Sequence, residues 1–121
     1  MTFRTACYAL MILCAGLAIG LLAVPDMFAV VFGMSPDPAA AVMTRRAGVL
    51  FVGLGGLIYC VRHVIEPAHQ QSISRVVVVL MAAVAALGLV EFFQSNVGVG
   101  IFVAVIPEVI FATLFWRYAW A

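Results

Sequence analysis

Four charged side chains lie within or beside apolar runs that predict membrane-spanning segments. Arg45 and Arg46 stand at the head of an apolar, glycine-rich run, and Glu91 and Glu108 interrupt two later runs. An ionised group at the bilayer centre costs at least about 3 kcal/mol, and such groups usually face the bundle interior and pair with one another. These residues could therefore form a buried ion pair, or line a site that binds a ligand or relays a proton.

Arg46 and Glu91 are the expected partners, with Glu108 close enough to join them through water. Residues 47–61 provide about 22 Å of helix at 1.5 Å per residue, whereas the hydrocarbon core is about 30 Å thick. Either the membrane is thinner around this helix, or the spanning helix includes the arginines. Arg45, about 100° further round the helix, should lean towards the headgroups. The pair could fix helix register, or it could belong to a polar ligand cavity.

Glycines provide faces on which helices can approach one another closely. Gly16 and Gly20 form a G-x-x-x-G pattern within the first apolar run. The run that follows Arg46 contains four more glycines, and it lacks both the G-x-G-x-x-G spacing and the preceding strand of a dinucleotide site. We therefore interpret all six as helix-packing residues: Gly16, Gly20, Gly48, Gly53, Gly55 and Gly56.

No arrangement typical of catalysis or metal binding is recognisable in the sequence. His63, Glu66 and His69 share one short segment, but Pro67 breaks the helical spacing between them and no standard zinc spacing is present. The apolar runs contain no histidine that could hold a haem. We therefore predict no catalytic residue, no metal and no required cofactor, and the sequence gives no ground to expect an enzyme. A quinone or a lipid remains a candidate ligand.

The composition requires the bilayer as solvent. Of 121 residues, 67% are hydrophobic and 9% are charged, against roughly 25% charged residues in soluble domains. A net charge of +1 argues against electrostatic binding of nucleic acid. The length allows one domain, residues 1–121. The three cysteines lie in apolar runs without a C-x-x-C pattern, so we interpret them as packing residues.

Four apolar segments are long enough to cross a membrane: residues 5–24, 38–63, 73–94 and 99–120. The first is too long for a signal peptide and lacks a cleavage site, so we expect a retained helix. Short connections make consecutive helices antiparallel neighbours, which predicts an all-α, up-down four-helix bundle. Residues 27–32 are apolar but too short to span, and they predict a short segment along the membrane interface.

Arginine placement predicts the orientation of the bundle. Four arginines fall on the side shared by both termini and the connection between the second and third spans: Arg4, Arg62, Arg75 and Arg117. The opposite side holds the other two. Because cytoplasmic loops carry an excess of basic residues, we expect both termini in the cytoplasm, in a bacterial inner (plasma) membrane.

Several short features of the sequence carry a family likeness: residues 25–33, Asp37, the run RAGVLFVGLGG from Arg46, and Arg62 with Arg75. In these features the chain resembles an uncharacterised family of small bacterial four-helix membrane proteins, a domain-of-unknown-function group with the DoxX-like architecture. The resemblance implies a fold and no activity. Small multidrug transporters also have four spans, but they carry an acidic residue in the first helix, and residues 6–24 contain none.

Two functions are consistent with this sequence. The first is an accessory or assembly subunit of a larger membrane complex, because the loops are minimal and the glycine faces suit docking. Its partners would be membrane lipids and other membrane subunits, or further copies of the chain. The alternative is a site for a quinone- or lipid-like molecule against Arg46, Glu91 and Glu108, which would allow a redox role. A cavity between the second, third and fourth spans would favour this alternative, whereas tight packing there, with glycine faces turned outward, would favour the accessory subunit.

Overall fold

The computed structural model describes residues 2–35 and 37–120, and every regular element within them is a helix. In chain order these are α1 (Phe3–Ala23), α2 (Pro25–Val31), α3 (Pro38–Val61), α4 (Pro67–Phe93), η1 (Val99–Ile101) and α5 (Phe102–Ala119). The helices α1, α3 and α4, and η1 with α5, are each long and apolar enough to cross a membrane. The predicted all-α bundle with four spans is confirmed, and the chain is a multi-pass membrane protein.

Three of the helices begin at a proline, which suits the first turn because its missing N–H has no intrahelical acceptor there. Pro38 follows Asp37 at the start of α3, as predicted. Pro67 starts α4, six residues before the predicted boundary. The proline that we interpreted as a break in helical spacing is thus the beginning of the helix. His69 consequently lies in the first turn of α4, where its Nδ1 is 3.3 Å from the Glu66 carboxylate.

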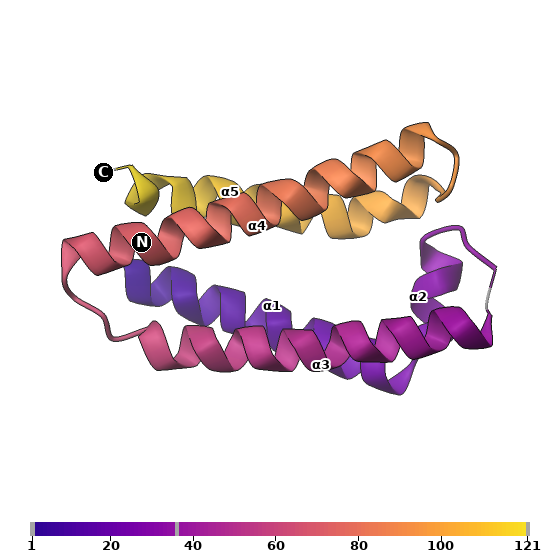
Figure 1. Cartoon of the computed structure of the whole chain (residues 1–121), viewed down its shortest axis with the longest axis horizontal. Coiled ribbons are helices and arrows are strands. Elements are labelled where there is room, and N and C mark those ends of the chain that lie inside the picture. The colour runs from indigo at the N-terminus through magenta and orange to yellow at the C-terminus, as the bar shows by residue number, and fades with distance from the viewer. Residues whose placement is uncertain (1, 36, 121) are drawn as a thin grey trace.

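The four spans form two helical hairpins. Figure 1 shows α1 beside α3 and α4 beside α5, with an interval between the two pairs, and these are the two closest helix pairings in the structure. We call them the α1/α3 hairpin and the α4/α5 hairpin. The hairpins meet mainly through α1 and α5. The consecutive helices α3 and α4 make little contact, so the prediction that all consecutive spans are neighbours is wrong for this pair.

A side-chain core joins the hairpins where α1 begins and α5 ends, which we call the terminal end. Phe115 of α5 and Leu10 of α1 are fully buried there. The Phe3 ring meets the rings of Phe115 and Tyr118 edge-on, at centroid distances of 6.2 and 5.8 Å. Cys7 and Cys14 are also buried in this core, as predicted. Cys60 is exposed, so the predicted packing role is wrong for this cysteine.

A backbone contact joins the hairpins at the opposite end, which we call the α2 end. Figure 1 shows α2 rising from the α1/α3 hairpin towards the turn between α4 and α5. The Gly98 amide donates to the Phe32 carbonyl at 2.7 Å. Gly33 has a φ of +76°, and a Cβ there would lie 2.7 Å from the Gly98 backbone. Glycine is needed both for the conformation and for the close approach.

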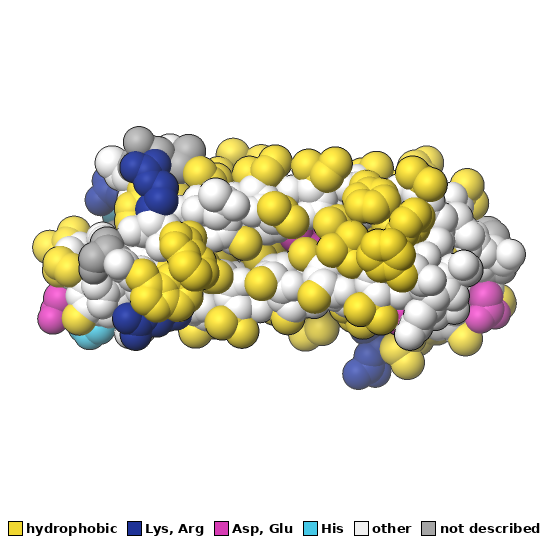
Figure 2. All heavy atoms as spheres, turned by 90° about the horizontal axis from the view of Figure 1, so that it is seen from above, with side chains coloured by type: hydrophobic (Ala, Val, Ile, Leu, Met, Phe, Trp, Pro, Cys, Tyr) yellow, Lys and Arg dark blue, Asp and Glu magenta, His cyan; other side chains and the backbone are white. Residues whose placement is uncertain are grey.

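The outer surface is apolar over the middle of the molecule. Figure 2 shows hydrophobic side chains along this stretch, with a small acidic patch recessed near its centre. The other charged side chains lie towards the two ends, with most of the visible basic groups at the terminal end. This distribution is the one that a bilayer requires, since charged side chains are stable at the interfaces and costly in the hydrocarbon region.

Candidate functional site

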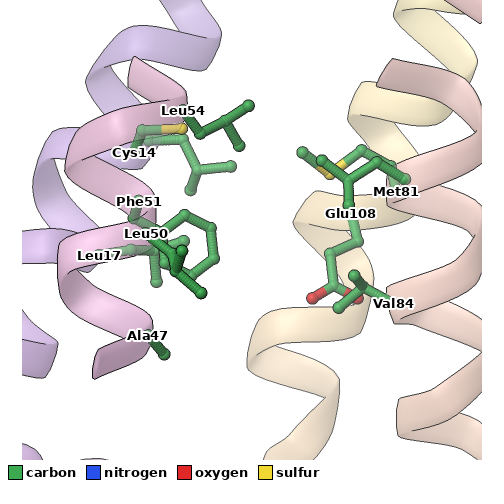
Figure 3. Close-up of a pocket in the computed structure, with 11 residues that line it drawn as sticks. Cys14, Leu17, Ala47, Leu50, Phe51, Leu54, Met81, Val84 and Glu108 are labelled. Carbon is green, nitrogen blue, oxygen red and sulfur yellow. The ribbon is translucent and has the colours of Figure 1, made fainter. Parts of the chain in front are cut away.

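A cavity of about 310 Å³ lies between the two hairpins. We call it the inter-hairpin cavity, and Figure 3 shows it with the α1/α3 hairpin on one side and the α4/α5 hairpin on the other. Its lining includes Cys14 and Leu17 of α1, and Leu80 and Val84 of α4. A second compartment of about 300 Å³ adjoins it towards the α2 end and shares Leu17 and Val84. The inter-hairpin cavity and this second compartment therefore form one continuous hollow along the middle of the bundle.

The α3 wall of the cavity arises from helical spacing. Ala47, Leu50, Phe51 and Leu54 recur at intervals of three and four residues, so they share one face of α3, and all four line the cavity. Gly48 lies about 100° away and faces α1, where a Cβ would be 2.9 Å from Leu22 Cγ. One face of α3 thus builds its hairpin while the next face borders the cavity.

Glu108 places a carboxylate in the wall of the cavity. It follows Pro107 within α5, and Figure 3 shows its side chain reaching towards the space opposite Phe51. All other described lining residues are hydrophobic. The Glu108 Oε2 atom is buried and has no hydrogen-bond partner among the described residues. Buried polar atoms almost always have a partner, so this atom indicates either a protonated acid or a place for a ligand group. The prediction that Glu108 faces the bundle interior is confirmed.

The predicted pair of Arg46 and Glu91 is not formed. Arg46 is exposed, and among the described residues it makes no ion pair with Glu91 or Glu108. It lies one helical turn before Leu50, at the edge of the cavity face of α3, and it is not among the residues that line the cavity. In addition, α3 packs on α1, and the cavity separates it from α5. Arg45 is exposed as well, so the two arginines do not differ in exposure.

Glu91 has a different partner from the one predicted. Its carboxylate accepts a hydrogen bond from Asn96 Nδ2 at 2.6 Å, beyond the end of α4. Glu91 also borders the second compartment, together with Glu108. The structure therefore places the two glutamates along one hollow and leaves both arginines outside it. Asn96 was not predicted as a partner, although a polar side chain just beyond the helix end was the available signal.

The six predicted packing glycines divide into two groups. A Cβ on Gly20 would lie 2.6 Å from the Phe28 ring of α2, and one on Gly55 would lie 3.3 Å from Cys14 Cβ of α1. Gly48 also packs against α1, as described above. In contrast, a Cβ on Gly16, Gly53 or Gly56 would meet open space. Of the G-x-x-x-G pattern of α1, Gly20 therefore lies against another helix among the described residues, and Gly16 does not.

These features define a four-span helical membrane protein with an apolar internal cavity and a carboxylate in its wall. When the chain is compared with models of protein families, with curated proteins and with solved structures, none matches. The resemblance to the DoxX-like group therefore stays a prediction.

Proposed function

We propose that this protein binds a lipophilic small molecule in the inter-hairpin cavity, with Glu108 as the polar anchor. The observation that carries the proposal is the buried, unpartnered Oε2 atom of Glu108 in an otherwise hydrophobic lining. Ligand sites are typically apolar cavities of about 300–1,000 Å³ with a few polar groups that fix orientation. A cavity of about 310 Å³ with an adjoining compartment of about 300 Å³ meets this description.

The position of the cavity supports entry from the bilayer. Leu50 of α3 and Leu80 of α4 both line it, yet their side chains are 74% and 37% exposed. Since α3 and α4 make little contact, the interval between them leads from the lipid-facing surface to Glu108. A molecule that partitions into the membrane would reach the site without crossing water.

The chemistry of Glu108 restricts the polar group of the ligand. A protonated carboxyl donates to a carbonyl, as in a quinone or an ester, and an ionised one accepts from a hydroxyl or amine. Without a nearby cation in the lining, the neutral form has the lower desolvation cost. We therefore propose a quinone- or lipid-like ligand that presents a carbonyl group. Arg46, which was expected to contribute to this site, takes no part in it.

The test uses the purified protein in detergent and a decyl-substituted benzoquinone as the probe, with bound probe counted by native mass spectrometry. Ala47→Phe fills the cavity and should abolish binding, whereas Ala40→Phe, an exposed position on the same helix, should not. Glu108→Gln keeps a donor and should retain binding, while Glu108→Leu should weaken it about tenfold or more. Equal binding by Ala47→Phe and Ala40→Phe would refute the proposal.

A second function keeps support from the exposed glycines. Gly16 on α1 and Gly53 and Gly56 on α3 face open space, and small residues are where membrane helices approach one another. An accessory subunit of a larger complex, or a homo-oligomer, would use such a surface. Cross-linking from cysteines placed at Gly53 in native membranes would detect the partner. Absence of any cross-linked product would leave the cavity as the functional feature.

We also propose that the protein lies in a bacterial inner membrane with both termini in the cytoplasm. The excess of arginines at the terminal end supports this orientation. The short helix α2 would then lie at the opposite interface, with the exposed Met27 and Val30 side chains in the lipid. A reporter that is active only outside the cytoplasm should stay silent when fused to the C-terminus, and strong activity would reverse the orientation.

A further inference from the structure

Another hollow, of about 300 Å³, lies at the terminal end and is lined by charged and polar side chains as well as apolar ones. It is formed by the start of α1, the connection between α3 and α4, and the first turn of α4. Its polar lining consists of Thr2, Arg4, Arg62, His63 and Gln70. Neither the ligand proposed above nor the packing of the hairpins accounts for this group of side chains.

Arg62 is held in place by two tyrosines. Its Nε donates to Tyr8 Oη at 3.1 Å, and an Nη donates to the Tyr59 carbonyl. The guanidinium also lies 3.6 Å from the centroid of the Tyr59 ring. A guanidinium has five N–H donors, and these two bonds leave three of them for a ligand. Arg62 thus enters a binding event with its orientation already fixed.

The connection that carries His63 is also fixed. The Val64 amide donates to the Val61 carbonyl at 3.1 Å, and Gln70 Nε2 donates to the Val64 carbonyl at 2.8 Å. The wall of the hollow is therefore tied to both α3 and α4. A preorganised wall reduces the entropy that a ligand must overcome on binding.

The charge of the hollow is uncompensated. No carboxylate is found among the described lining residues, and neither Arg4 nor Arg62 forms an ion pair within the described chain. The acid next along the sequence, Glu66, lies 3.3 Å from His69. Desolvation is the main cause of the lowered pKa of His63, and the charges of Arg4 and Arg62 lower it further.

We propose that this hollow binds a phosphate group, with Arg4 and Arg62 as its cationic ligands. Guanidinium groups match phosphate oxygens in both charge and geometry. The hollow begins where α3 ends at Val61, so it lies at the level at which a membrane span meets the headgroups. A phospholipid headgroup is one source of the phosphate, and a soluble phosphate compound is the other. This site is independent of the ligand proposed for the inter-hairpin cavity.

The test measures lipid binding to the detergent-solubilised protein by native mass spectrometry. Phosphatidylglycerol should bind more tightly than a lipid of equal chain length without phosphate, such as diacylglycerol. Each basic residue near an anionic surface contributes about 1 kcal/mol, so Arg4→Gln should weaken phosphatidylglycerol binding about fivefold. Arg62→Gln removes a positioned donor group and should have a larger effect, about tenfold.

Arg46→Gln is the matched control, because it removes the same charge from an exposed position towards the α2 end. It should leave binding unchanged. Inorganic phosphate, added as competitor, separates the two sources: displacement of the lipid indicates a site for any phosphate, and no displacement indicates a headgroup site. Equal loss in Arg4→Gln and Arg46→Gln, or equal binding of the two lipids, would overturn the proposal. Among the described residues, no side-chain hydrogen bond of Arg4 supports the fold, so Arg4→Gln should fold normally. It therefore still tests the proposal if Arg62→Gln fails to fold.

Discussion

A glycine comparison within α3 tests how the α1/α3 hairpin packs. A Cβ on Gly48 would lie 2.9 Å from Leu22 Cγ and 3.2 Å from Leu21 Cβ, whereas a Cβ on Gly53 would meet nothing within 4 Å. Real Cβ atoms rarely approach others so closely. Leu22 can turn towards lipid, but Leu21 Cβ is attached directly to the α1 backbone. Gly48→Ala should therefore force the two helices apart.

The expected change in the free energy of unfolding is the sum of two opposing effects. Replacing a helical glycine by alanine stabilises a helix by about 0.8–1 kcal/mol, and this gain applies equally at Gly48 and Gly53. Overpacking costs about 1–3 kcal/mol, and it applies at Gly48 alone of the two. Gly53→Ala should thus match or exceed the wild-type free energy of unfolding. Gly48→Ala should fall below Gly53→Ala by about 1–3 kcal/mol.

The assay is reversible unfolding in mixed detergent micelles, with helicity followed by circular dichroism. Gly56→Ala provides a second control, because a Cβ there also meets open space. If Gly48→Ala is as stable as the two controls, then α1 and α3 are not in the contact described here. If Gly53→Ala is the least stable of the three, the helix is rotated and the outward glycines are the packed ones.

Three further changes have defined outcomes. Gly33→Ala combines an unfavourable φ with a clash against Gly98, so amide exchange around Gly98 should rise, and unchanged exchange would contradict the contact at the α2 end. Phe115→Ala in the terminal core should lower the free energy of unfolding by about 3–5 kcal/mol, and a loss below about 1 kcal/mol would place that ring outside the core. The pKa of His63 should lie below 6.5 in an NMR titration. Arg4→Gln should raise the pKa of His63, and an unchanged pKa would show that Arg4 does not lie near this histidine.

The His63 shift also has a consequence for stability. Its pKa is lower in the folded protein than the ordinary 6.5, so just below pH 6.5 the unfolded chain binds more protons than the folded one. Stability should therefore fall as the pH is lowered from 6.5 towards the folded pKa. The same titration in His63→Gln should lack this component. A wild-type stability that instead rises on acidification through this range would reverse the sign of the shift.

The spans were predictable because membrane crossing depends on the length and hydrophobicity of each segment by itself. The bounds of α3 differ from the predicted segment by two residues at its end, and α4 begins earlier because Pro67 serves as a first-turn residue. The inward orientation of Glu108 was predictable as well, since an acidic group in the middle of a span avoids lipid.

The partners of the charged residues could not be predicted in the same way. Helical periodicity gives the residues that share a face, but it does not give the helix that lies opposite. Arg46 and Glu91 were matched by depth, and depth leaves the rotation of each helix undetermined. The contact of Arg62 with Tyr8 joins residues 54 positions apart, and it depends on α1 lying beside the end of α3. The position of the cavity could not be predicted for a related reason, because its hydrophobic lining residues have the same spacing along the helices as residues of a packed core.

The division into two hairpins has a consequence for how the protein assembles in the membrane. Residues 3–61 contain one complete hairpin and residues 67–119 contain the other, so each pair can form from helices that are neighbours along the chain. Helices that are stable across the bilayer associate in a separate, later step. Docking of one preformed hairpin on the other is then the event that creates the cavity. Any molecule that occupies the cavity contacts both hairpins, so its binding would stabilise the docked arrangement relative to two separated hairpins joined by residues 62–66.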